Sequence, residues 1–101
     1  MKPLGKFTQD PAERLDYVFN FAPLLAPDGP DTIASTVFST EREDGAVGPL
    51  LTLTPILVTG DVVSVWVSGG AVDDVHYVFA TVTTAGTRIW KRSIKLTIKR
   101  N

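Results

Sequence analysis

The sequence predicts an all-β fold, an antiparallel β-sandwich of about seven short strands. Three apolar runs, at residues 62–67, 75–84 and 89–98, are separated only by turn-forming residues such as Gly69, Gly70 and Gly86. In the last run, apolar and polar residues alternate with the period of two that is typical of a strand with one buried face. We expect these three runs to be neighbouring strands of one sheet.

Size and composition predict a single folding domain. The chain has 101 residues, 44% of them hydrophobic, and is rich in the β-branched residues that suit a pleated sheet. It has no cysteine, so disulfide and thiolate chemistry are excluded. The first residues lack the apolar run of a signal peptide, and no apolar stretch approaches the roughly 20 residues of a membrane-spanning helix.

The net charge of −1 argues against a nucleic-acid partner, because such proteins usually carry a basic surplus that neutralises phosphates. The C-terminal strand is nevertheless locally basic. We interpret its charges as a solvated strand face or as protein-interface charge. The residues concerned are Arg88, Lys91, Arg92, Lys95, Lys99 and Arg100.

The N-terminal half divides into an arm and the first strands. Residues 1–14 are polar and contain prolines, which predicts an extended arm, either frayed or ordered against a neighbouring subunit, before a sandwich over residues 15–101. Leu15, Tyr17, Phe19 and Phe21 occupy alternate positions, so this strand should place its aromatic rings in the core.

Prolines and charges mark the next boundaries. Three prolines in residues 22–30 end the first strand, and we expect Leu24 and Leu25 to plug one end of the core. Residues 31–40 predict a second strand. Its alternation is imperfect, so the sequence does not show which face of this strand is buried. Residues 41–45 indicate a solvated turn without the ligand spacing of a metal site. Pro49 and Pro55 interrupt residues 47–58, which predicts edge strands.

The tally of short strands and regularly spaced turns favours an immunoglobulin-like sandwich over a barrel. Several further stretches are informative together: Asp10-Pro11-Ala12-Glu13-Arg14-Leu15-Asp16-Tyr17-Val18-Phe19, Asp31-Thr32-Ile33, Val65-Trp66-Val67-Ser68-Gly69-Gly70, Thr83-Thr84-Ala85-Gly86-Thr87-Arg88 and Arg92-Ser93. With these stretches the chain resembles a family of small tailed-bacteriophage proteins, described as fibre-tail adaptors or tail-associated structural proteins. The resemblance covers most of the chain and is weakest over residues 41–58, and it implies an immunoglobulin-like sandwich.

The sequence departs from this family at one position. Members tend to carry a tyrosine at the start of the strand after the Ser-Gly-Gly turn, where its hydroxyl can tie a corner to the backbone, whereas this chain has His76. In one register His76 points inward and its neighbour Tyr77 points outward. In the alternative register Tyr77 takes the corner, and every side chain of the strand changes face.

The first register predicts a protein interface. Trp66, Tyr77 and Phe79 then stand in one aromatic cluster on an outer face, and Trp90 extends that cluster or lies at the rim of the core. Exposed aromatic clusters mark contact surfaces. Together with Arg88 and Arg92, these residues form the candidate interface. In the alternative, the strand registers are misassigned and the aromatic rings lie in the core.

Catalysis has little support. With His76 the only histidine and no cysteine, neither a two-histidine metal site nor a complete nucleophilic triad can be assembled. Asp73 and Asp74 are adjacent in a turn, so they do not face each other across a cleft. We therefore predict no enzyme activity, no cofactor and no metal.

The resemblance implies a structural protein of the virion, made in the host cytoplasm, that links tail, neck or baseplate to fibres. Its partners would be other virion proteins, in a symmetric multi-copy assembly, with no membrane and no nucleic acid. Two alternatives stay open: a carbohydrate- or receptor-binding module at a fibre tip, and a capsid decoration protein.

Overall fold

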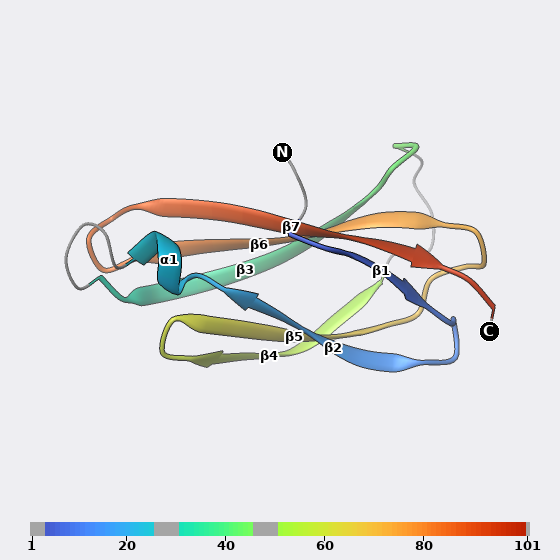
Figure 1. Cartoon of the computed structure of the whole chain (residues 1–101), viewed down its shortest axis with the longest axis horizontal. Helices are drawn as coiled ribbons and strands as arrows, with labels where there is room; N and C mark the ends of the chain where they lie inside the picture. Colours follow the sequence, from blue (N-terminus) through green and yellow to red (C-terminus); the bar gives the residue numbers. More distant parts are fainter. Residues whose placement is uncertain (1–3, 26–30, 46–50, 101) are drawn as a thin grey trace.

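The computed structural model describes residues 4–25, 31–45 and 51–100. They form seven strands in two facing sheets, with one single-turn helix (Figure 1). The all-β sandwich predicted from the sequence is therefore confirmed, whereas its immunoglobulin-like character stays a prediction. The elements are β1 (Lys6–Gln9), β2 (Arg14–Asn20), α1 (Ala22–Leu25), β3 (Ile33–Arg42), β4 (Thr52–Thr59), β5 (Val62–Ser68), β6 (Val75–Thr84) and β7 (Ile89–Ile98).

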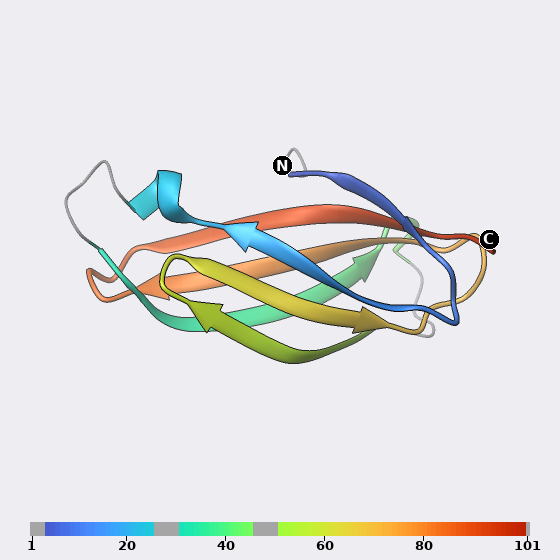
Figure 2. The same cartoon turned by 60° about the horizontal axis from the view of Figure 1, so that its bottom comes forward.

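Strand order explains how the layers are built. The four-stranded sheet has the order β1-β7-β6-β3, and the three-stranded sheet has the order β2-β5-β4. All pairs are antiparallel except β1 with β7, which are parallel. In Figure 2 the three-stranded sheet lies in front of the four-stranded sheet, and the strands of both sheets run roughly along the long axis of the molecule.

The prediction that the last three apolar runs share one sheet is wrong. β6 and β7 do pair, but β5 belongs to the other sheet, between β2 and β4. Val63, Val65 and Val67 are fully buried on the inner face of β5. A run of alternating residues shows that a strand has one buried face, and it does not show which sheet the strand joins.

The core lies between the two inner faces. Tyr17, Phe19 and Phe21 are buried as the alternation predicts, although Leu15, near the start of β2, is 39% exposed. Leu25 in α1 is buried, and Leu24 packs against the same cluster, so these leucines do cover part of the core. The N–H of Ala22 donates to the Asn20 side-chain oxygen (3.0 Å), which helps to end β2 and start this turn.

The N-terminal segment is tied to both sheets. β1 pairs with the C-terminal half of β7, and Gln9 at its end is fully buried. The Gln9 side chain donates to the carbonyl of Val67 in the opposite sheet (2.9 Å) and accepts from the Tyr17 hydroxyl (2.7 Å). Residues 6–9 thus act as a strand of their own chain's sheet. The division into an arm of residues 1–14 and a sandwich of residues 15–101 stays a prediction.

The middle strands lie at the sheet edges. β3 continues through Glu41 and Arg42, which pair with Tyr77 and His76, so the predicted solvated turn begins only after these residues. β4 is an edge strand, as its proline predicts, and the register shifts between Leu53 and Ile56 around Pro55. The predictions that rest on residues 26–30 and 46–50 lie outside the described residues.

Candidate protein interface

The register of β6 is the one that points His76 inward. His76, Val78, Ala80 and Val82 are fully buried, whereas the residues between them are only partly buried. Tyr77 and Phe79 therefore lie on the outer face of the four-stranded sheet. The alternative register, with Tyr77 at an inward corner, is not observed.

Lysines cover both rings of this outer face. The Lys91 ammonium lies 4.3 Å from the centroid of the Phe79 ring, and the Lys95 ammonium lies 6.0 Å from that of Tyr77. The two rings themselves are 6.3 Å apart. A cation over an aromatic face is attracted by the negative potential of the ring. We call Tyr77, Phe79, Lys91 and Lys95 the aromatic-lysine patch.

An ion pair anchors one end of the patch. Glu43 accepts from the Tyr77 hydroxyl (3.1 Å) and pairs with Lys95 (2.8 Å). The hydrogen bond from Lys95, then that from Tyr77, lowers the pKa of Glu43, and the same carboxylate raises the pKa of Lys95. Both groups stay charged near neutral pH, and since they are solvent-exposed, the pair orients the patch more than it stabilises the fold.

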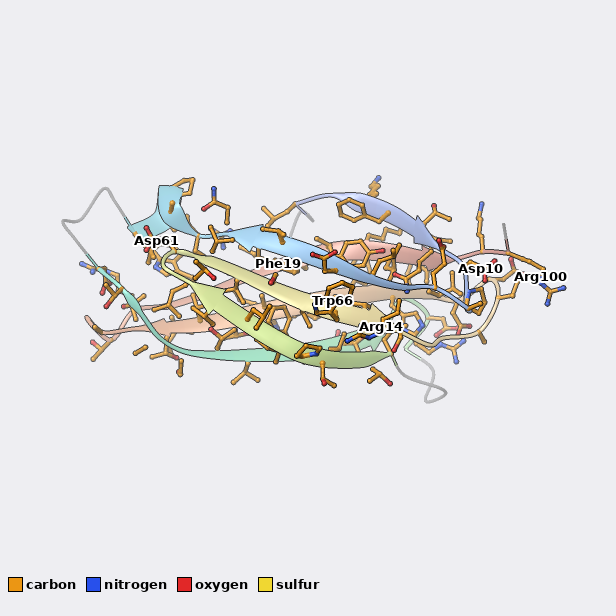
Figure 3. All side chains as sticks on the ribbon, turned by 90° about the horizontal axis from the view of Figure 1, so that it is seen from below. Asp10, Arg14, Phe19, Asp61, Trp66 and Arg100 are labelled. Carbon is orange, nitrogen blue, oxygen red and sulfur yellow. The ribbon has the colours of Figure 1, made fainter. Side chains whose placement is uncertain are left out.

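Trp66 lies on the opposite side of the molecule. It faces outward from β5 in the three-stranded sheet, and the Arg14 guanidinium lies 4.6 Å from the centroid of its ring (Figure 3). The prediction of one cluster containing Trp66, Tyr77 and Phe79 is therefore wrong, because the strands belong to different sheets. The chain presents two separate aromatic surfaces.

The remaining candidates lie along β7 and the turn before it. Trp90 and Arg92 pair with Val82 and Ala80, so both lie on the inner face, and Trp90 packs at the rim of the core. The Arg92 guanidinium lies 5.6 Å from the centroid of the Trp90 ring. Arg88 in the turn pairs with Asp31 (3.2 Å), which joins that turn to the start of β3.

Hydrogen bonds keep Asp31 ionised. The largest contribution comes from the Thr84 side chain, followed by the backbone N–H groups of Gly86 and Thr32 and by Arg88, and together they lower the pKa of Asp31. Its role is therefore to hold the turn between β6 and β7 in place. The Arg88 guanidinium takes part in the same contact through its ion pair with Asp31.

Sequence reasoning missed an exposed apolar edge. On β4, Ile56, Leu57 and Val58 are 40%, 54% and 48% exposed. The register places Ile56 and Val58 on the inner face, and among the described strands β4 is an edge of its sheet. The clue in the sequence is a run from Thr52 to Thr59 without a single charge. Such an edge is open to pairing with another chain.

Buried His76 lacks hydrogen-bond partners. Neither ring nitrogen has a partner among the described residues, and Nε2 lies 3.6 Å from the Asp74 carboxylate, which is too far for a hydrogen bond. Burial lowers the pKa of His76, and the nearby Arg42 guanidinium adds to this, whereas Asp74 and Asp44 act in the opposite direction. The histidine is neutral at pH 7.

Acid should therefore destabilise the fold through His76. The unfolded chain takes up this proton near pH 6.5, before the folded chain does, so the contribution of His76 to stability is constant above that pH and falls as the pH drops below it. We expect the free energy of unfolding to be lower at pH 5.5 than at pH 7.5, by at most about 1.4 kcal/mol, because one proton contributes about that much per pH unit. Urea unfolding at both pH values measures it. His76→Phe should abolish most of the difference, and an unchanged difference would exclude His76 as its source.

A family comparison identifies the kind of protein that carries these surfaces. A model of the family described as podophage GP4 fiber-tail adaptor protein gp77 matches residues 9–97. The chain belongs to this family. No curated protein matches the chain significantly.

Membership in this fibre-tail adaptor family confirms the predicted resemblance and supports a structural rather than enzymatic protein of the phage tail. The match includes β2 to β6 and nearly all of β7, so it covers both aromatic surfaces. Within the described ranges, no cluster of three or more histidine or acidic residues is arranged to hold a metal ion. The helix in the described part of the chain is too short to cross a membrane.

Proposed function

We propose that this adaptor works by being held between virion proteins, with one partner on each outer face of its sandwich. The tail or neck side would bind one aromatic surface and the fibre side the other. Several copies, arranged by the symmetry of the tail, would add avidity to contacts that are weak singly. No chemical step is involved.

The observation that carries this proposal is the placement of large aromatic rings on two opposite outer faces. Trp66 and the pair Tyr77 and Phe79 lie outside the core, each beside a cation. Tryptophan, tyrosine and arginine are enriched among the residues that dominate binding energy at protein interfaces. Two such surfaces on one small domain suit a protein that joins two others.

Rigidity supports the same role. The strands of the sandwich are tied across the two sheets by Gln9 and packed on a continuous apolar core. A partner that binds one face therefore meets a surface whose strands are already fixed in place, so little conformational entropy is lost on binding. A stiff domain also fixes the distance between the proteins on its two sides.

Replacing the rings of the aromatic-lysine patch tests the proposal. In phage that carry Tyr77→Thr/Phe79→Thr, we expect the adaptor or the fibres to be lost from purified particles, because both anchors of one surface are gone. Threonine keeps the β propensity of the strand, so the melting temperature of the isolated protein should change little. Quantitative mass spectrometry of particles gives the copy numbers.

Two further variants sharpen the result. Trp66→Ala removes the anchor of the opposite face and should release the other partner, whereas Val72→Ser removes an exposed apolar side chain from a turn and should have no effect. Particles with the normal number of adaptors and fibres in both ring variants would refute the proposal. A wild-type copy number that is a multiple of six at one axial level would support an adaptor, whereas hundreds of copies would indicate decoration.

A further inference from the structure

Half of β7 has an open edge. Residues 95–97 pair with β1 on one side and with β6 on the other. In the described part of the chain, residues 89–92 pair with β6 alone. Among the described residues, the first half of β7 thus has no strand on its β1 side, and in Figure 1 the β7 ribbon extends past the start of β1.

The alternation of the strand identifies the groups on this edge. The Ser93 carbonyl accepts from the Leu4 N–H (2.7 Å), and the Lys95 N–H donates to the Gly5 carbonyl (2.9 Å), so odd-numbered residues point toward the β1 side. Ile89 and Lys91 therefore direct their backbone groups to the open edge. The Ile89 side chain is 69% exposed.

Arg92 covers one of these backbone groups. Its Nη1 donates to the Lys91 carbonyl at 2.7 Å, so the guanidinium occupies an acceptor that an added strand would use. This contact is local and exposed, and a competing N–H can replace it at low cost. A strand that pairs at Lys91 would therefore have to displace the Arg92 guanidinium from this carbonyl.

The charges beside the edge determine what fits. Lys91 lies on the outer face and Arg92 on the inner face, and neither forms an ion pair with a described carboxylate. Neighbouring residues of an added strand point to opposite faces, so two consecutive acidic residues would reach both cations. A neutral or basic strand would leave both cations without a carboxylate to pair with.

We propose that the open edge of residues 89–92 binds an extended acidic segment of a partner virion protein, which adds as a strand to the four-stranded sheet. The inference rests on the proposed adaptor function and names the chemistry of one partner. Strand addition of this kind uses backbone hydrogen bonds for affinity and side chains for selectivity.

A second copy of this chain is a poor occupant. Pairing β7 with β7 of a second copy would bring Lys91 and Arg92 close to Lys91 and Arg92 of that copy. Like charges on paired strands are destabilising. Of the acidic residues that follow β3, Glu43 pairs with Lys95 and Asp44 pairs with Arg42. Charge complementarity therefore favours a different protein.

A tethered probe tests the proposal on the full chain. The segment Val-Thr-Glu-Glu-Thr-Val is joined to the N-terminus by a ten-residue Gly-Ser linker, whose reach is about 17 Å. Hydrogen exchange of the amides at positions 89 and 91 is followed by NMR. We expect at least tenfold slower exchange at both amides than with the matched Val-Thr-Gln-Gln-Thr-Val segment, and a loss of the difference in high salt.

Variants show whether the edge and its cations are responsible. Lys91→Ser/Arg92→Ser should remove the tenfold difference, whereas Lys99→Ser/Arg100→Ser removes the same charge beyond the open edge and should preserve it. Lys91→Pro deletes the outward N–H without disturbing the pairing with β6 and should prevent binding.

Several results would overturn the inference: equal exchange with the acidic and neutral segments, protection at other strand edges only, or slow exchange that depends on protein concentration without a segment, which would indicate self-association. Incorporation of Lys91→Ser/Arg92→Ser into particles separates the two proposals. Normal copy numbers in that variant, with loss in the Tyr77→Thr/Phe79→Thr variant, would refute the edge site and leave the adaptor function intact.

Discussion

Replacing Gly70 by alanine is expected to lower the free energy of unfolding by about 2–4 kcal/mol. Gly70 has a φ of +89°, a conformation that disfavours any residue with a Cβ atom. An added Cβ would also lie 2.9 Å from the Ile98 side chain and 3.1 Å from that of Leu51, both of which are buried. Backbone strain and overpacking therefore act at the same position.

Gly60→Ala separates these two causes. Gly60 also has a positive φ, +59°, in the turn between β4 and β5, but nothing lies within 4 Å of the added Cβ. It should show the strain alone, about 1 kcal/mol. Urea unfolding of both variants gives the comparison. Equal losses would mean that the core around Ile98 yields freely and that the tight contact at Gly70 costs nothing.

Replacing Gln9 by alanine is expected to cost about 3 kcal/mol, because it leaves several buried polar groups without partners. The Tyr17 hydroxyl loses its acceptor, and the carbonyls of Val67 and Glu13 each lose the donor that Gln9 Nε2 provides at 2.9 Å. Burial, and secondarily the Glu13 carboxylate, raises the pKa of Tyr17 to about 12, so the phenol stays protonated and keeps its need for an acceptor.

Thr8→Ala is the control for Gln9, since its side chain is exposed on the same strand, and it should change stability by less than about 0.5 kcal/mol. Tyr17→Phe should restore part of the stability when combined with Gln9→Ala, because it deletes the orphaned hydroxyl. A Gln9→Ala variant as stable as Thr8→Ala would show that β1 contributes little and that residues 1–14 behave as a detachable arm. Hydrogen exchange of the β1 amides gives a direct measure.

Much of the fold could be predicted from alternation alone. Phe19, Val78 and Leu96 are buried, and Tyr77 and Phe79 are outside, because a strand turns successive side chains to opposite faces. Prolines and glycines marked the strand ends for a similar local reason, since they restrict or widen the backbone angles of their own residue. The family motifs, too, are local runs of sequence.

The pairing of strands could not be predicted in the same way. The period of two is identical whichever sheet a strand joins, so residues 62–67 gave no sign that β5 pairs with β2 rather than with β6. The parallel pairing of β1 with β7 joins residues almost 90 positions apart. Such long-range pairs depend on the whole chain and leave no local signature in the sequence.

For the candidate interface, too, the sequence indicated some features, and the tertiary structure was needed for the others. The sequence by itself determined that Tyr77 and Phe79 share one face of their strand, because successive side chains alternate, but it left two registers open for whether that face is outside or in the core. Only the tertiary structure decided that Trp66 lies on the opposite surface from the other two rings, and that β7 keeps an open edge beside Arg92. Both depend on which strands are neighbours, and neighbours are selected by the packing of two sheets around one core.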